Sequence, residues 1–442
     1  MIDVLLVYPC DYKQLSGEKL DIYDTRELGL LYLASVLVNN GYNVELLPAV
    51  YNLKELESKI KKIVGENNLK LVATTGLTHE YPAAQWVLKK VKEIDKNVRT
   101  VIGGQHVTWL AEEVLTESPY IDVVAKGEGE IIILDLLKKD LKDVKGIVYR
   151  ENGVIKENST NEFCKEIILL NEGVLKNYLR KITEKFDGIK FNLSSSRGCP
   201  YNCLYCSEVK FWGNFVRNKP VEDTINELDI FCNSKTRNKI ICFWDSTFTV
   251  DPKYTKELCG AVKKRDYDFG FWCYTRVDTY NKEVAGVLRG AGFNSLAFGV
   301  EHFHPEVLKT MGKNISEEQV KKALENAKEL NQLTRVYFIT GHPGDNAERA
   351  LYSYQRAKKF IDLGLIDMVQ PFIFVPYPAT DVFKNPLKYN AEILSYDWIK
   401  YMRDTYPVIE YKDFSADEIY YLFMLFEKLK LRNKEEFYGV DA

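Results

Sequence analysis

The first part of the chain alternates short apolar runs with amphipathic stretches. The apolar runs are residues 3–9, 43–49, 69–77, 99–104 and 122–128, and stretches with helical spacing, such as 28–41 and 81–95, lie between them. Apolar runs of this length predict buried strands, and their alternation with helices predicts a parallel sheet covered on both faces. Ligands of such sheets bind beyond the carboxyl ends of the strands. We therefore expect residues 1–140 to form a flavodoxin-like or Rossmann-like α/β domain.

A second series of strand-like runs starts at residue 191. It has six runs, from FNLSSS to DMVQPFIFVPYP, and helical patterns such as residues 316–330 separate them. Six such units predict a partial (β/α)6 barrel with reactive groups at the strand carboxyl ends. We place this barrel at 191–385. A connector at 141–190, with a hairpin turn at Asn152-Gly153, precedes it, and a short helical segment at 386–442 follows it.

Composition limits the classes of protein that this chain can belong to. Its 442 residues are 46% hydrophobic and 28% charged, which is typical of a globular protein with two or three domains. With 60 Lys and Arg against 63 Asp and Glu, no basic excess indicates a nucleic-acid partner. We find no apolar run of membrane-spanning length and no signal peptide. The nine scattered cysteines predict reduced thiols in a cytoplasmic protein.

Three of these cysteines lie close together in RGCPYNCLYCSE, at positions 199, 203 and 206. Structural zinc usually takes four protein ligands, and no fourth Cys or His stands nearby. Three thiolates on one loop suit a 4Fe–4S cluster that leaves one iron open to a cofactor or substrate. A zinc knuckle and unconnected core cysteines are the alternatives.

With Tyr205 before the third cysteine, this run resembles the signature of radical S-adenosylmethionine (SAM) enzymes. The resemblance implies that Cys199, Cys203 and Cys206 bind a 4Fe–4S cluster and that SAM binds its open iron. One-electron reduction of SAM then gives a 5′-deoxyadenosyl radical, which removes a hydrogen atom from the substrate. The element FWDSTFTVDP (243–252) and the barrel that follows the cysteines resemble the same family.

Later strand ends resemble the SAM-contacting parts of that family. They are YTRVD, FGVEHF and FITGHPGD. The resemblance implies that Tyr205, Arg276 and Glu301 contact SAM, and a guanidinium fork matches the geometry of a carboxylate. An ion pair at the end of the barrel is the other role open to Arg276 and Glu301.

The N-terminal domain resembles cobalamin-binding domains in two of their three sequence elements. Thr75-x-Leu77 and Gly103-Gly104 match two elements, whereas Lys13 stands where the third would place a ligand histidine. Radical SAM enzymes with an N-terminal cobalamin domain share this departure, and residues 27–45 and 121–130 resemble that group. The resemblance implies cobalamin bound without a histidine from the first loop. The implied cobalamin contacts are Thr75, Leu77, Gly103, Gly104, Gly127 and Glu128.

A Rossmann-like domain that has lost its ligand is the alternative for this part of the chain. His79 and His106 lie near strand ends and could face the cobalt, although ordinary loop positions are the more common case. Cys10 could approach the corrin, but an isolated cysteine is usually a small buried residue.

Along nearly its whole length the chain thus resembles cobalamin-dependent radical SAM enzymes. The resemblance implies a methyltransferase that acts on an unactivated carbon of a small-molecule or peptide natural product, where the 5′-deoxyadenosyl radical abstracts hydrogen and methylcobalamin donates the methyl group. Ring contraction, cyclisation or other redox chemistry with the same cofactors is the alternative within the enzymes. A non-catalytic iron–sulfur electron-transfer protein is the alternative outside them. A methylthiotransferase normally needs a second cluster, and only Cys10 and Cys164 precede Cys199.

The same resemblance implies the partners of the protein. We expect an external one-electron reductant, either flavodoxin or ferredoxin, no nucleic acid and no membrane span. A cytoplasmic monomer is expected.

Overall fold

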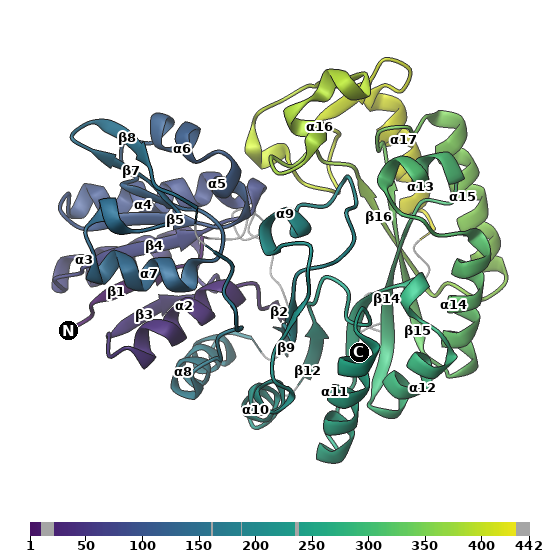
Figure 1. Cartoon of the computed structure of the whole chain (residues 1–442), viewed down its shortest axis with the longest axis horizontal. Helices are drawn as coiled ribbons and strands as arrows, with labels where there is room; N and C mark the ends of the chain where they lie inside the picture. Colours follow the sequence, from purple (N-terminus) through teal and green to yellow (C-terminus); the bar gives the residue numbers. More distant parts are fainter. Residues whose placement is uncertain (10–21, 161, 187, 235–237, 430–442) are drawn as a thin grey trace. The chain divides into compact units, whose positions relative to one another are not determined.

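The structure is a computed structural model of the whole chain (Figure 1), and it describes residues 1–9, 22–160, 162–186, 188–234 and 238–429. Cys10 and Lys13, which entered the cobalamin prediction, lie outside the described residues. The chain divides into two compact units, residues 1–189 with 227–237 and residues 190–226 with 238–442. Within the described residues, no helix is long and apolar enough to cross a membrane.

The first unit is built on a sheet with the strand order β3-β1-β4-β5-β6-β7-β8. Its parallel strands are β1 (Val4–Val7), β3 (Val44–Leu47), β4 (Leu71–Thr75), β5 (Arg99–Gly103) and β6 (Val123–Ala125). All five predicted strands are therefore confirmed. In chain order the parallel part runs 2-1-3-4-5, which is the flavodoxin-like arrangement.

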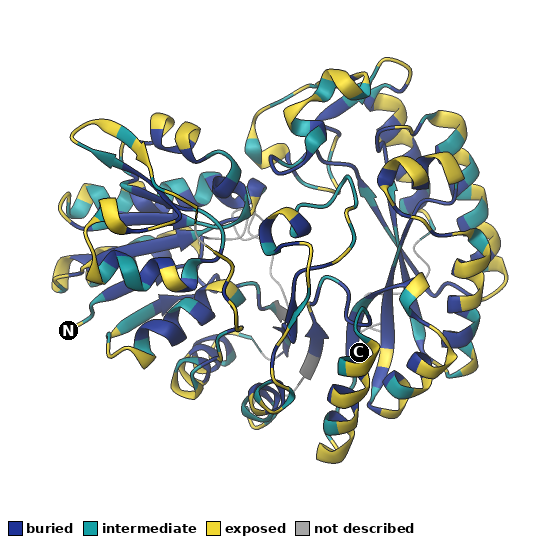
Figure 2. Ribbon diagram, viewed as in Figure 1, coloured by how far each residue is buried: buried dark blue, intermediate teal, exposed yellow. Residues whose placement is uncertain are grey.

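Helices cover both faces of this sheet, as the apolar runs predicted. α2 (Leu28–Asn39) packs beside α7 (Gly129–Lys138), and α3 (Leu53–Glu66) packs beside α4 (Tyr81–Ile94). Every residue of β1 has no exposed surface, because a strand between two helical layers meets water on neither side. Figure 2 shows the central parallel strands mostly in dark blue and the outer faces of the helices in yellow.

The predicted hairpin is present and extends the same sheet. β7 (Ile147–Glu151) pairs antiparallel with β8 (Val154–Glu157) and with β6. Asn152 and Gly153 both have positive φ, 51° and 80°, as a type I′ turn requires. Residues of the connector at 141–190 thus add two strands to the edge of the sheet.

A buried carboxylate ties three segments of the first unit together. Glu27 has no exposed surface, and its Oε1 accepts a hydrogen bond of 2.8 Å from the Ala49 amide. Its Oε2 accepts one from the hydroxyl of Tyr178 on α8 (Glu172–Thr183). Glu27 therefore links the start of α2, the loop after β3 and α8.

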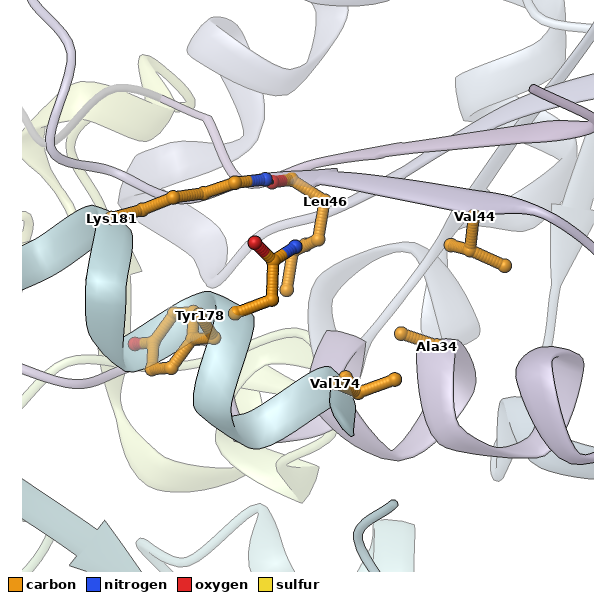
Figure 3. Close-up of a pocket in the computed structure, with 7 residues that line it drawn as sticks. Ala34, Val44, Leu46, Val174, Tyr178 and Lys181 are labelled. Atoms are coloured by element: carbon orange, nitrogen blue, oxygen red, sulfur yellow. The ribbon is translucent and has the colours of Figure 1, made fainter. Parts of the chain in front are cut away.

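A small pocket lies where α8, α2 and β3 meet (Figure 3). Lys181 lines it, and its ammonium donates to Glu45 and to the Leu46 carbonyl, 2.7 Å each. The charge in the pocket is thus already compensated. The lining residues are Ala34, Val44, Leu46, Val174, Asn177, Tyr178 and Lys181, none of which the sequence analysis singled out.

The second unit contains the predicted partial barrel. Its strands follow the order β9-β12-β13-β14-β15-β16. They are β9 (Gly188–Leu193), β12 (Asn238–Phe243), β13 (Phe271–Arg276), β14 (Phe293–Glu301), β15 (Leu333–Thr340) and β16 (Met368–Ile373). The pairs from β12 to β16 are parallel. The helices α11 (Pro252–Arg265), α12 (Lys282–Gly290), α14 (Glu317–Glu329) and α15 (Ala347–Asp362) lie along one face of this sheet (Figure 1).

The segment after residue 386 is less helical than the sequence suggested. Helix α17 (Ala416–Glu427) is present and begins with a capping box between Ser415 and Glu418. Before it, β17 (Ala391–Ile393) and β18 (Ile409–Tyr411) form an antiparallel pair. Three-residue strands are too short to leave an alternating pattern, so the sequence analysis missed them.

The remaining described helices and strands are short or connect larger elements. They are β2 (Ile22–Asp24), η1 (Thr78–Glu80), α5 (Gln105–Trp109), α6 (Ala111–Glu117), η2 (Leu141–Asp143), β10 (Ser196–Arg197), α9 (Glu208–Trp212), β11 (Arg217–Asn218), α10 (Val221–Cys232), η3 (Val277–Thr279), α13 (Pro305–Met311), α16 (Asp381–Lys384), η4 (Pro386–Tyr389) and η5 (Trp398–Lys400).

The Glu27 contacts predict a large stability effect. Glu27→Ala leaves the Ala49 amide and the Tyr178 hydroxyl buried without this acceptor, and we expect a loss of about 3 kcal/mol in the free energy of unfolding. Urea unfolding followed by circular dichroism measures it. Glu66→Ala, at the exposed end of α3, is the control and should change stability by less than about 0.5 kcal/mol. Equal effects of the two substitutions would contradict the role of Glu27.

Candidate active site

The three-cysteine loop begins at a glycine that no other residue can replace without strain. Gly198 has a φ of +89°, and a Cβ there would lie 1.9 Å from the carbonyl oxygen of Phe215. The Cys199 amide donates to the Gly213 carbonyl at 3.4 Å. β10 and β11, which pair antiparallel, hold the start of the loop next to this contact. The loop therefore starts from a fixed backbone.

The end of α13 holds the middle of the loop. The Leu204 amide donates to the Met311 carbonyl at 2.9 Å. Gly312 follows with a φ of +70°, and a Cβ there would lie 3.1 Å from the Asn202 carbonyl oxygen. The close approach of these two backbones fixes the loop from a second side.

The thiols have surroundings that fit an iron–sulfur cluster. Burial raises the pKa of the Cys199 and Cys206 thiols, so both favour the protonated form until positive charge arrives. Among the described residues, no three His, Cys, Asp or Glu side chains converge as they would on a single metal ion. A cluster keeps its ligand sulfurs apart with its own iron and sulfide core, so a cluster site does not require such convergence. Three thiols on one loop are the donor set of a 4Fe–4S cluster with one open iron.

Arg276 lies beside this loop, at the end of β13. One of its terminal nitrogens is 4.0 Å from the Cys203 sulfur, and its guanidinium carbon is 3.6 Å from the centre of the Tyr201 ring. Its other two nitrogens donate to both Asp278 oxygens, at 2.8 and 2.7 Å. The barrel-end ion pair given as the alternative for Arg276 is thus present, and it holds the guanidinium next to the cysteines.

Glu301 lies at the end of β14 in a strained backbone conformation. Its φ is +68°, which is uncommon for a residue with a side chain and typical of functional sites. Its Oε1 accepts from Lys313 at 2.9 Å and from the Tyr205 hydroxyl at 3.2 Å. Burial and the Glu301 carboxylate raise the pKa of Tyr205, so the hydroxyl stays protonated. A Cβ at Gly299 would lie 2.6 Å from the Glu301 oxygen, so glycine makes room for this carboxylate.

Two buried polar residues of the site were not predicted from the sequence, and the first is Lys313, because a lysine in the polar stretch after a helix is normally solvated. In the structure Lys313 is 2% exposed. The second is Asp245, just after β12, which accepts from the Ser195 hydroxyl at 2.9 Å and from the hydroxyl of Ser196. Burial raises the pKa of Asp245 despite these donors. Asp245 therefore joins β12 to the segment that leads into the cysteines.

The predicted cobalamin residues of the first unit meet at the carboxyl ends of β4 and β5. The Thr75 hydroxyl donates to the Gly103 carbonyl at 3.3 Å, and Leu77 is 41% exposed at the same edge. Gly104 has a φ of +105°, and a Cβ there would lie 2.6 Å from the Thr75 hydroxyl oxygen. Packing within the domain therefore already requires glycine at 104.

Gly127 and Glu128, two further residues predicted to contact cobalamin, differ in their surroundings. Gly127 has a φ of +79° and leaves open space where a Cβ would be, which suits the close approach of a ligand. Glu128 is buried and accepts from the Cys164 amide at 2.7 Å, so it holds the connector.

The two histidines near the strand ends have different surroundings. His106 is 1% exposed and its ring centre lies 4.5 Å from that of Tyr81, and burial lowers the pKa of His106 to about 3. His79 is half-buried in η1.

Comparison with known proteins agrees with both parts of this description. The Radical SAM superfamily matches residues 193–357, and the B12 binding domain matches residues 22–137. A protein of Pyrococcus horikoshii named uncharacterized methyltransferase PH0819 is 32% identical over 428 residues, which cover 93% of this chain and 90% of that protein. The chain belongs to the cobalamin-dependent radical SAM family. The predicted cofactors, a 4Fe–4S cluster, SAM and cobalamin, are those of this family.

More distant family members share the fold. The anaerobic magnesium-protoporphyrin IX monomethyl ester cyclase of Rubrivivax gelatinosus is 26% identical, with 80% of this chain and 65% of the cyclase covered. The structure of the methyltransferase TsrM from Kitasatospora setae superposes with a TM-score of 0.70 at 17% identity, over 86% of this chain and 74% of TsrM. OxsB superposes with a TM-score of 0.70 at 19% identity, over 100% of this chain and 62% of OxsB.

The cysteine loop predicts which thiols carry the cluster of this family member. Cys199→Ala, Cys203→Ala and Cys206→Ala should each abolish cluster iron and reductive cleavage of SAM, because one missing thiolate leaves the cluster underligated. Iron analysis and 5′-deoxyadenosine formation after anaerobic reconstitution measure the two effects. Cys232→Ala, outside the loop, should keep both. Normal 5′-deoxyadenosine formation by Cys203→Ala would refute the assignment.

The buried Lys313–Glu301 pair predicts a specific effect on SAM. Lys313→Met leaves the Glu301 carboxylate without its cation next to Tyr205, and we expect SAM affinity to fall about tenfold or more in equilibrium binding to the reconstituted protein. Lys328→Met is a matched control, because Lys328 pairs with buried Asp367 at the opposite end of β15 and β16. It should cost stability and leave SAM affinity unchanged. An equal loss of affinity in both variants would show a general folding defect instead.

Proposed function

We propose that this chain is a cobalamin-dependent radical SAM methyltransferase that methylates an unactivated carbon of a small-molecule or peptide substrate. The observation that carries the proposal is the fixed three-cysteine loop with Arg276 and Glu301 beside it. A flavodoxin-like domain of the B12 binding type in the same chain and the methyltransferase name of the 32% identical relative support it.

The proposal assigns roles to the residues of each unit. Cys199, Cys203 and Cys206 hold the cluster in a barrel that we place at 191–385. Tyr205, Arg276 and Glu301 position SAM. We assign cobalamin to residues 1–140, with the following contacts: Thr75, Leu77, Gly103, Gly104, Gly127 and Glu128. The contact of Glu128 with the Cys164 amide makes it the residue of this set with the most evident structural role.

When bound, the cluster and SAM supply a radical that removes a substrate hydrogen atom, and cobalamin supplies the methyl group. The protein's own part is to place charge and to exclude water. Arg276 and Lys313 offer positive charge and Glu301 offers negative charge, which together complement a ligand that carries both a carboxylate and an ammonium group. Burial of these side chains in a low-dielectric site strengthens each contact.

Cyclisation or ring contraction with the same cofactors is the second candidate, because the 26% identical relative is named a cyclase. Both candidates need an external one-electron reductant, and we propose flavodoxin or ferredoxin for this role. We further propose that the protein acts as a monomer in the cytoplasm.

SAM labelled in its methyl group separates the two candidates. The assay contains the labelled SAM, cobalamin, a low-potential reductant and an unmethylated candidate substrate. Methyl transfer then predicts that the label appears in the product. It also predicts S-adenosylhomocysteine and 5′-deoxyadenosine in about equal amounts, since one SAM donates the methyl group and a second is cleaved reductively. Liquid chromatography with mass spectrometry measures all three.

The Cys203→Ala protein is the control for radical chemistry and should give no labelled product. Substrate-dependent 5′-deoxyadenosine without S-adenosylhomocysteine and without label in the product would overturn methyl transfer and favour the second candidate.

A further inference from the structure

Two of the residues assigned to cobalamin lie just beyond the paired part of β5 and β6. The backbone ladder between these strands ends at the pair Ile102 and Val124, and Gly104 and Gly127 follow it. Loops that continue past the last pair of a ladder are no longer held together by the hydrogen bonds of the sheet. The spacing of the two glycines therefore depends on other contacts.

Thr108 supplies such a contact. It is buried on α5, which packs against β5 and β6. Its hydroxyl donates to the Gly104 carbonyl at 2.8 Å and accepts from the Gly127 amide at 3.1 Å. Both loops are thus bonded to one oxygen atom. We call this contact of Thr108 with Gly104 and Gly127 the β5–β6 link.

The β5–β6 link is more than the usual hydrogen bond of a threonine within a helix. A threonine hydroxyl often bonds to the carbonyl four residues earlier, and the bond to Gly104 is of this kind. The bond from Gly127 comes from a residue 19 positions later in the chain. The neighbouring Lys126 amide donates to the Gly146 carbonyl of the hairpin instead. Thr108 therefore sets the place of Gly127 relative to Gly104.

A second buried contact joins β1 to the loop after β4. Glu80 is buried, and its Oε2 accepts from the Leu77 amide at 2.9 Å. The Tyr8 hydroxyl, just after β1, donates to the same carboxylate at 3.0 and 3.1 Å from its two oxygens. Burial raises the pKa of Tyr8, so the hydroxyl keeps its proton. We call this contact of Tyr8, Glu80 and Leu77 the β1–β4 link.

Both links hold backbone at positions where the domain leaves space. Leu77 is a large apolar side chain that is 41% exposed, and a Cβ at Gly127 would have no heavy atom within 4 Å. Ordering a loop when a ligand binds reduces affinity, so a loop that is already held binds more tightly. The links therefore suit a site that is formed before its ligand arrives.

We propose that Thr108 and Glu80 are positioning residues of the cobalamin site. Thr108 sets the spacing of Gly104 and Gly127. Glu80 holds the backbone of Leu77. Both residues act through these neighbours and lie within the part of the chain that matches the B12 binding domain, residues 22–137. This inference rests on the proposed function, because it takes the assigned contacts to be contacts with cobalamin.

Two substitutions at one position test the β5–β6 link in the full chain with its reconstituted cluster. Thr108→Val keeps the shape of the side chain and removes the hydroxyl, and we expect cobalamin affinity to fall about tenfold. Thr108→Ser keeps the hydroxyl and should bind like the wild type. Equilibrium dialysis against hydroxocobalamin, read by absorbance, measures the affinity. The same loss in both variants would overturn the role of the hydroxyl.

Thr100→Val is the matched control, because it removes a buried threonine hydroxyl from the opposite end of β5. The Thr100 hydroxyl donates to the Tyr120 carbonyl at 2.8 Å. This variant should unfold at a lower urea concentration and keep the cobalamin affinity of the wild type. An equal loss of affinity in Thr100→Val and Thr108→Val would show a general folding effect and overturn the inference.

Glu80 gives an independent test, which also decides the matter if Thr108→Val fails to fold. Glu80→Met leaves the Leu77 amide without its acceptor, and we expect cobalamin affinity to fall about tenfold. Glu80→Gln keeps an acceptor oxygen at the same place and should restore most of the affinity. Wild-type affinity in Glu80→Met would refute the β1–β4 link.

The wild-type titration separates this inference from the proposed function. A wild-type protein that takes up no cobalamin would refute the cobalamin assignment, and this inference with it. Cobalamin uptake with the same affinity by the wild type, Thr108→Val and Glu80→Met would refute the positioning roles and leave the proposed function standing.

Discussion

The attachment of the cysteine loop to the strand ends is the constraint on which the site depends. A Cβ at Gly198 would clash with a backbone carbonyl at 1.9 Å, and one at Gly312 would lie only 3.1 Å from a second carbonyl. A buried ion pair between Glu301 and Lys313 then reaches the loop through the Tyr205 hydroxyl. A buried pair of this kind adds little net stability, but removing one partner is costly. The geometry of the loop is therefore tied to the end of β14.

The ends of neighbouring strands in the second unit carry residues that we assign to SAM. β13 ends in Arg276 beside the cysteines, and β14 ends in Glu301. A parallel sheet brings these ends together, because all its strands point the same way. Residues from different strands can thus act together at one edge of the sheet.

In the first unit, the residues predicted to contact cobalamin also lie near the carboxyl ends of parallel strands. Its parallel strands end at Thr75 and Gly103, where a flavodoxin-like sheet offers its ligand edge. Gly104 is required by the neighbouring Thr75, whereas Gly127 leaves open space. The backbone conformation of Gly127, with a φ of +79°, favours glycine even though no neighbour crowds the position. Glu128 accepts a hydrogen bond from the Cys164 amide of the connector, so this predicted cobalamin contact also has a structural partner.

Sequence alone determined the order of strands and helices, the hairpin at Asn152-Gly153 and the cysteine spacing, because each depends on neighbours within a few residues. Periodicity and turn chemistry are local, and they survive without knowledge of the fold. Lys313 and Asp245 have no local signature, since their burial comes from segments about 10 to 50 residues away. The conformation of Glu301 likewise exists only once strands pair in register. Tertiary structure decided these features, because they arise from contacts between strands rather than along them.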